Sequence, residues 1–225
     1  MKGKAALQAV GENRMLKRED LLLYLCTDRG LSLGRPITET VEAAIAGGVT
    51  MVQLREKAAP TGEFYAIARE VQAVTRRRHI PLVINDRLDI ALAIGAEGLH
   101  IGQSDLPLRE ARRLAGDMFI GVSTSTLEEA RQAQADGADY LGVGAVYPTG
   151  SKADAGEAIG LAGFAEICAA VRIPVVGIGG INTANTAAVI RAGAAGIAVI
   201  SAILSQPDIE AASRTLRMII DNGAK

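Results

Sequence analysis

The sequence predicts a single-domain α/β protein folded as a (β/α)8 TIM barrel, and three observations lead to that prediction. The chain has 225 residues, a length at which α/β barrels commonly form one unit. A glycine that follows an alanine-rich stretch and precedes an apolar run recurs four times. Eight short apolar runs occur along the chain, and helical stretches separate most of them, which indicates a parallel sheet closed into a barrel.

The recurring glycines are predicted to end helices, because each fits the position just after a helix C-terminus. They lie 47, 42 and 56 residues apart, at Gly48, Gly95, Gly137 and Gly193. The eight strands are expected, in chain order, within residues 21–28, 48–55, 80–86, 95–102, 118–124, 137–144, 173–180 and 193–200. We expect helices at 61–78, 107–115, 126–136 and 161–171, a polar N-terminal extension over 1–19, and the barrel over 20–225.

Composition sets further expectations. Hydrophobic residues make up 49% of the chain and aromatic residues only 3%, so we expect a core of Val, Ile, Leu and Ala, which suits a parallel sheet covered on both faces. The net charge of −1 argues against nucleic acids and membrane surfaces as partners. No apolar run is long enough to span a membrane. Cys26 and Cys168 lie in apolar runs and are interpreted as buried thiols of a reducing, cytoplasmic compartment. The oligomeric state, a homo-oligomer included, is left open.

An open, doubly wound sheet is the alternative architecture. Such a sheet usually carries G-x-G-x-x-G after an early strand. That pattern is missing here, because the nearest match, Gly142-Val-Gly144-Ala-Val-Tyr147, lacks the third glycine. In a closed barrel the chemistry lies just beyond the C-terminal ends of the strands. The polar residues at those ends are therefore the candidates for function.

The second expected strand ends in two cations. Alternation along a strand places Gln53, Arg55 and Lys57 on the same face as Met51, which is the barrel interior. Two cations that emerge together at the rim form an anion site. An internal layer of salt bridges is the alternative interpretation.

The third and fourth expected strands end in carboxylates. Asn85 and Asp86 close one strand, and Gln103 and Asp105 follow the next. Helix capping is the alternative role for both aspartates, above all for Asp105, which precedes Leu-Pro. Two carboxylates on adjacent strand ends, beside an Arg and a Lys, are nevertheless suited to Mg²⁺, which binds carboxylates together with substrate phosphates and water.

The remaining strand ends carry hydroxyls, glycines and one lysine that suits a phosphate. Ser123 ends the fifth strand, a loop with Thr149, Ser151 and Lys152 follows the sixth, and Gly180 and Ser201 follow the last two. The loops after strands seven and eight are the usual phosphate site of this fold. A general base is harder to identify, because His79 ends a charged helix and His100 is expected to pack inside the barrel. Cations and a metal without a base suit the departure of a diphosphate.

Taken together, these strand-end motifs resemble the thiamine-phosphate synthase (thiamine-phosphate pyrophosphorylase) family over roughly residues 21–220. The motifs are QLREK at 53–57, ND at 85–86, GQSD at 102–105, GVS at 121–123, YPTGSK at 147–152, GIGGI at 177–181 and IS at 200–201. The resemblance implies a transferase of thiamine biosynthesis. It would join 4-amino-2-methyl-5-hydroxymethylpyrimidine diphosphate to 4-methyl-5-(2-hydroxyethyl)thiazole phosphate and release pyrophosphate through a carbocation.

The resemblance also implies roles for individual residues. The pyrimidine diphosphate would be held by Gln53, Leu54, Arg55, Glu56, Lys57, Asn85, Ser123 and Lys152, of which Arg55, Lys57, Ser123 and Lys152 would be catalytic. The thiazole phosphate would be held by Thr149, Gly150, Ser151, Gly180, Ile200 and Ser201. Mg²⁺ would be bound by Asp86 and Asp105.

Two positions depart from the family pattern. Ser151 stands where the family usually has Thr, and it keeps the hydroxyl. Ser125 stands where many relatives, and the related thiazole tautomerases, carry His. A tautomerase is therefore a weaker alternative, as is a non-catalytic regulatory paralogue, because the charged residues of the predicted diphosphate and metal sites are all present.

Overall fold

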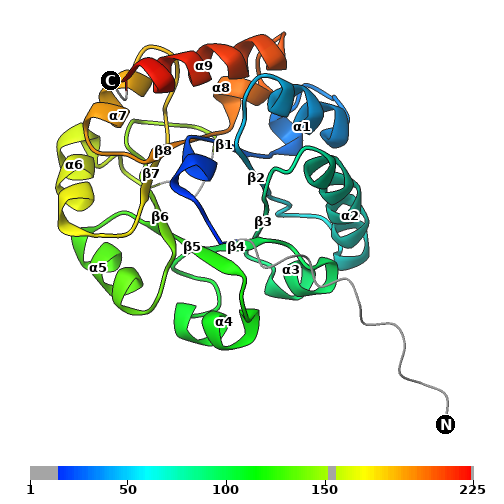
Figure 1. The fold of residues 1–225 in the computed structure, drawn as a ribbon, viewed down its shortest axis with the longest axis horizontal. Coiled ribbons are helices and arrows are strands. Elements are labelled where there is room, and N and C mark those ends of the chain that lie inside the picture. The colour runs from blue at the N-terminus through cyan, green and yellow to red at the C-terminus, as the bar shows by residue number, and fades with distance from the viewer. Residues whose placement is uncertain (1–14, 152–155, 224–225) are drawn as a thin grey trace.

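Eight parallel strands form a closed barrel in the computed structural model, which describes residues 15–151 and 156–223. Neighbouring strands pair in chain order, and β8 pairs with β1 to close the ring (Figure 1). This arrangement confirms the predicted barrel and excludes the open doubly wound sheet. The strands are β1 Leu23–Cys26, β2 Met51–Leu54, β3 Leu82–Asn85, β4 Gly98–Ile101, β5 Phe119–Thr124, β6 Tyr140–Val143, β7 Val175–Ile178 and β8 Gly196–Val199.

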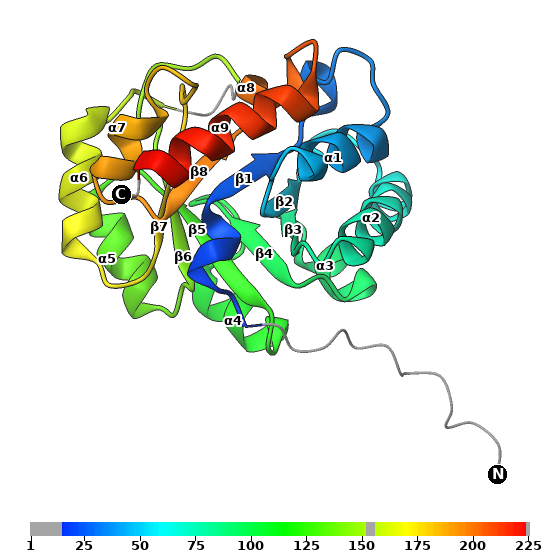
Figure 2. The same ribbon diagram turned by 45° about the horizontal axis from the view of Figure 1, so that its top comes forward.

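Helices surround the strands as an outer layer. Each of the four predicted helices is present, as α2 Thr61–Arg77, α4 Leu108–Ala115, α5 Leu127–Ala135 and α6 Gly160–Ala170. The other helices are α1 Ile37–Ala46, α3 Leu88–Ile94, α7 Thr186–Arg191, the short α8 Ser201–Leu204 and α9 Ile209–Gly223. The last helix, α9, packs between α7 and α1 and so joins the end of the ring to its beginning (Figure 2). Within the described residues, no helix combines the length and apolarity that a membrane crossing requires.

The recurring glycines end helices, as predicted. Gly48, Gly137 and Gly193 each follow the last capping residue of a helix, and Gly95 is itself the C-cap of α3. Their φ angles lie between 63° and 106°, a region that disfavours residues with a Cβ atom. The repeat is therefore a repeated helix-to-strand turn.

The barrel interior differs from the core that composition predicts. Its largest side chains are aromatic, because Tyr24 and Tyr140 are fully buried with ring centroids 6.0 Å apart, and Phe119 packs against Tyr140. Glycines on neighbouring strands make room for these rings. A Cβ atom on Gly121 would lie 2.0 Å from the Tyr140 ring, and one on Gly98 would lie 2.2 Å from the Phe119 ring. The expectation of a purely aliphatic core is therefore wrong for this layer.

The N-terminal end of the barrel is covered by the segment before β1. A 3₁₀ helix, η1 Arg18–Leu21, lies over the middle of the strand ring (Figure 1). Leu21 is fully buried, and its carbonyl approaches Gly196 so closely that a Cβ atom there would be 1.9 Å away. Of the predicted extension, residues 1–14 lie outside the described residues, and Leu16 packs against the core. With this end closed, the cavity described next opens at the opposite, C-terminal end of the strands.

Candidate phosphate-binding site

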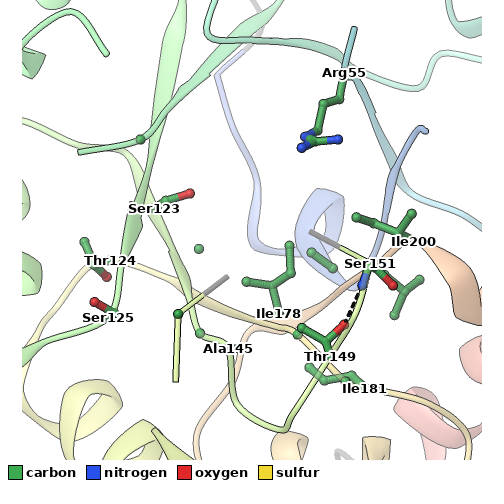
Figure 3. Close-up of a pocket in the computed structure, with 18 of the residues that line it drawn as sticks. Arg55, Ser123, Thr124, Ser125, Ala145, Thr149, Ser151, Ile178, Ile181 and Ile200 are labelled. Carbon is green, nitrogen blue, oxygen red and sulfur yellow. Dashed lines mark hydrogen bonds between the residues drawn. The ribbon is translucent and has the colours of Figure 1, made fainter. Parts of the chain in front are cut away.

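A cavity of about 1050 Å³ opens at the C-terminal ends of the strands. In Figure 3, Ser123 lies on the left of the view and Arg55 at the top, with Ile200, Ser151 and Thr149 below Arg55. Residues far apart in the sequence meet here because every parallel strand delivers its end to the same rim. Of the residues assigned to the site from sequence, the cavity is lined by Arg55, Lys57, Asn85, Asp86, Asp105, Ser123, Thr149, Gly150, Ser151, Gly180, Ile200 and Ser201.

Arg55 is held at the rim by the residues that follow β1. Its Nη1 lies 3.0 Å from Oδ2 of Asp28, and its backbone N–H donates to Thr27 Oγ1. Asp28 in turn accepts from the N–H of Gly30. Because only 11% of the Arg55 side chain is exposed, this pairing fixes a guanidinium in the cavity wall. The sequence analysis missed Asp28, although it stands at a strand end like the aspartates that were considered.

Lys57 and two carboxylates form a second charged group. Lys57 Nζ lies 2.6 Å from Asp86 Oδ2, and Asp105 Oδ2 accepts from the N–H of Gly102 at 2.7 Å. Burial raises the pKa of Asp105; the Gly102 N–H opposes that shift, and the neighbouring Asp86 adds to it. The two carboxylates are thus close enough to disfavour each other's charge, which an added cation would relieve.

The alternative roles weighed for these charged residues can now be compared with the geometry. Neither Asp86 nor Asp105 caps the helix after it, because the N-cap residues of α3 and α4 are Arg87 and Pro107. Arg55 and Lys57 do form ion pairs, but both also line the cavity. The salt-bridge and anion-site interpretations therefore describe the same residues without a ligand and with one.

The charged group suits a cation that takes only part of its ligands from protein. No cluster of three or more His, Cys, Asp or Glu able to hold a metal occurs in the described chain. Two neighbouring carboxylates are present, and one or two carboxylates with substrate phosphates and water is the usual arrangement for Mg²⁺. A metal here would depend on a phosphate ligand to complete its shell.

The opposite wall carries hydroxyls and backbone instead of charge. Ser151 Oγ lies 3.0 Å from Ser201 Oγ, and the Ser151 N–H donates to Thr149 Oγ1 (Figure 3). Ser201 is the first residue of α8. Gly180 has a φ of 64°, and a Cβ atom there would lie 2.7 Å from both Tyr147 Cβ and the Pro148 carbonyl. The contact between two loops thus requires glycine at position 180.

Ser123 lies between the two walls and contacts the barrel interior. Its Oγ is 2.9 Å from His100 Nε2, and its carbonyl accepts from Gln103 Nε2. His100 is 6% exposed, so the expectation of a packed barrel residue is confirmed. Ser125 also lines the cavity, and its hydroxyl hydrogen-bonds to Glu129.

Three residues assigned to the diphosphate from sequence do not line the cavity. Gln53 is 2% exposed and donates from Nε2 to the Tyr24 hydroxyl, and Leu54 is fully buried. The Glu56 side chain is 4% exposed and pairs with Arg29; burial raises the pKa of Glu56, although Arg29 opposes that shift. The fourth residue without a place in this geometry, Lys152, lies outside the described residues.

Comparison with known proteins gives a consistent result. A profile of the family described as thiamine monophosphate synthase matches residues 23–203. The chain is 53% identical to the thiamine-phosphate synthase of Moorella thermoacetica, over 88% of this chain and 95% of that protein. It is 52% identical to that of Chloroflexus aurantiacus, over 89% and 93%. A solved thiamine phosphate pyrophosphorylase from Pyrococcus furiosus superposes with a TM-score of 0.87 at 43% identity, over 92% of this chain and 99% of that one.

Proposed function

The chain belongs to the thiamine monophosphate synthase family, and from that premise we propose how its cavity divides the work of the reaction. The protein is a transferase of thiamine biosynthesis. Its substrates are 4-amino-2-methyl-5-hydroxymethylpyrimidine diphosphate and 4-methyl-5-(2-hydroxyethyl)thiazole phosphate. The observation that carries this proposal is the division of a single cavity into a charged wall and a neutral wall.

The charged wall receives the diphosphate. Arg55, Lys57 and Asn85 supply donors there, and Ser123 supplies a hydroxyl. The bond between the pyrimidine methylene carbon and the diphosphate oxygen breaks, and its electron pair leaves with pyrophosphate. Negative charge grows on the departing group, so fixed cations stabilise the transition state more than the ground state. Lys152 joins this group by resemblance alone.

The neutral wall receives the thiazole phosphate. Thr149, Ser151 and Ser201 provide hydroxyls, and the backbone near Gly180 and Ile200 comes close to the cavity. A phosphate anchored there points the thiazole toward the pyrimidine. The thiazole nitrogen then donates its lone pair to the carbocation and forms the new C–N bond. No proton has to be removed in this step, which agrees with a cavity in which no general base was identified.

A divalent cation completes the charged wall. Asp86 and Asp105 would hold Mg²⁺, which neutralises phosphate charge when bound. Without the metal, Lys57 neutralises Asp86. Although Gln53 does not line the cavity, it would contact the pyrimidine ring from beneath the rim, because its buried Oε1 has no partner within the described residues and a ligand N–H can supply one. We place the reaction in the cytoplasm, since both cysteines are free thiols.

The cavity fits neither alternative function well. A tautomerase needs an acid or base over the phosphate. Ser125 is a poor candidate for that role, and its hydroxyl is already hydrogen-bonded to Glu129. A non-catalytic paralogue has no need for a complete set of charged residues on one wall.

Product formation is the direct test. Purified protein is mixed with both substrates and Mg²⁺, and thiamine phosphate is measured by mass spectrometry. We expect product, loss of product in excess EDTA, and recovery when Mg²⁺ is restored. Asp86→Asn should raise the Mg²⁺ concentration needed for half-maximal rate by at least the roughly 10- to 100-fold that loss of a supporting group costs a metal site. Asp89→Asn, which removes a carboxylate from the surface nearby, is the matched control.

The outcomes separate the parts of the proposal. If no thiamine phosphate forms from the complete mixture, the proposed synthase activity is wrong. Full activity in EDTA would leave the synthase standing and remove the metal.

A further inference from the structure

A chain of hydrogen bonds crosses the barrel interior beneath the cavity. Gln53 Nε2 lies 2.8 Å from the Tyr24 hydroxyl, which lies 2.9 Å from the Tyr140 hydroxyl. The Tyr140 hydroxyl is 3.0 Å from His100 Nδ1, and His100 Nε2 is 2.9 Å from Ser123 Oγ. Five side chains from five different strands thus connect the buried Gln53 to a hydroxyl on the cavity wall.

These side chains are enclosed by the barrel, so they hydrogen-bond to one another in place of bulk water. Tyr24, Gln53, His100 and Tyr140 are each buried, and only Ser123 is partly exposed. Burial raises the pKa of Tyr24 and of Tyr140 far above that of a free phenol. Both tyrosines therefore keep their protons at any physiological pH and can pass on one donor each.

Donor and acceptor chemistry gives the chain a direction. The Gln53 amide nitrogen can only donate, so the Tyr24 oxygen accepts from it. With its oxygen already accepting from Gln53, Tyr24 is placed to give its hydrogen to Tyr140, and Tyr140 in turn to give its hydrogen to Nδ1 of His100. An Nδ1 that accepts leaves the ring proton on Nε2, and that proton is directed to Ser123 Oγ. The hydrogen of the Ser123 hydroxyl is left to point elsewhere, and the cavity lies in front of it.

We propose that this chain fixes Ser123 as a hydrogen-bond donor toward the anionic ligand of the charged wall, with Tyr140 and His100 as positioning residues. The proposal rests on the proposed function for the identity of that ligand, a diphosphate. If the chain ran the other way, Ser123 would donate to His100 and would turn only lone pairs toward the cavity. Lone pairs on the Ser123 oxygen would repel the anionic oxygens of the diphosphate. The direction of the hydrogen bonds therefore decides whether Ser123 strengthens or weakens diphosphate binding.

The His100 tautomer reports the direction without any substrate. The protein contains two histidines, so a ¹⁵N-labelled sample gives two ring systems in a long-range ¹H–¹⁵N correlation spectrum. The signal that remains in His79→Gln identifies His100. At pH 7.5 we expect the Nε2–H tautomer. An Nδ1–H tautomer or a doubly protonated ring would overturn the proposal.

A double-mutant cycle tests whether the chain acts through Ser123. Tyr140→Phe keeps the ring packed against Gly121 and removes the hydroxyl. We expect it to lower kcat about three- to tenfold, the range for one neutral hydrogen bond, and to leave KM for the thiazole phosphate unchanged. In a Ser123→Ala background, the same change should have almost no further effect on kcat. Tyr65→Phe, on the partly exposed face of α2, is the control and should match wild type.

A purely structural role for Tyr140 gives a different result. The factors by which the two single changes lower kcat would then multiply in the double variant, as they do for independent sites. That outcome would refute the positioning role. Thermal unfolding of each variant shows whether the fold is retained. If wild type makes no thiamine phosphate, the proposed function fails, yet the tautomer measurement still decides the direction of the chain.

Discussion

The two walls of the cavity present different chemistry to a ligand. The charged wall, built from the ends of β1 to β4, uses Arg55 and Lys57, each paired with an aspartate. The neutral wall, built from the loops after β6 to β8, uses Ser151 and Ser201, which bond to each other. The two described cations of the charged wall stand among the carboxylates of Asp28, Asp86 and Asp105, whereas the neutral wall presents uncharged hydroxyls.

The difference suggests how the enzyme keeps its two ligands apart. A diphosphate with a metal gains most from cations, whereas a monophosphate can be held by hydroxyls and backbone N–H groups. A change confined to one wall should therefore leave binding at the other wall unaffected.

The largest effect is expected for Arg55→Ala. This change removes a fixed cation and leaves Asp28 facing the diphosphate without its partner. Because loss of one preorganised donor costs about 10²–10³ in rate, kcat/KM for the pyrimidine diphosphate should fall by at least that factor, measured by steady-state kinetics. Arg87→Ala removes an arginine that follows β3 but bonds to Asp89 and Thr61 outside the cavity, and it should stay within about twofold of wild type. Equal losses in both variants would contradict the charged wall.

A smaller and more selective effect is expected for Ser201→Ala. Loss of one hydroxyl should raise KM for the thiazole phosphate about three- to tenfold, the range for a single hydrogen bond. KM for the pyrimidine diphosphate should not change, since that ligand lies against the other wall. Ser205→Ala is the matched control, because the Ser205 hydroxyl already donates to the Leu31 carbonyl. If KM for both substrates rose together, the division into two walls would be wrong.

The smallest effect is expected from salt. Raising the ionic strength from about 0.05 M to about 0.3 M shortens the range of charge–charge attraction. KM for the pyrimidine diphosphate should rise roughly two- to threefold, and KM for the thiazole phosphate should rise less. In Arg55→Ala the difference between the two substrates should shrink. A salt response that is the same for both substrates in wild type would show that cations do not distinguish the walls.

The fold could be predicted from sequence because its signal is local and repeated. Each of the four glycines marks the end of a helix, and each stands before a strand. The aromatic interior could not be predicted in the same way. Tyr140 fits only because Gly121 lies opposite it on the neighbouring strand, and that register depends on how the closed sheet assembles.

The site was predictable to the extent that topology decides it. Every parallel strand ends at one rim, so polar residues after the strands could be assigned to a common site. The contiguous motif QLREK was less informative, because neighbouring residues of a strand face opposite sides. Leu54 and Glu56 accordingly lie away from the cavity, while Arg55 and Lys57 line it. Gln53 lies on the cavity side but one step deeper, beneath the rim.

The fit of aromatic rings against glycines also limits the order in which substitutions can accumulate in this protein during evolution. A Cβ atom at position 121 would overlap the Tyr140 ring, so Gly121→Ala requires position 140 to become smaller first. The reverse order passes through a variant in which the new Cβ atom and the Tyr140 ring compete for the same space. Positions 121 and 140 are therefore epistatic, and in descendants of this sequence their substitutions should appear as pairs.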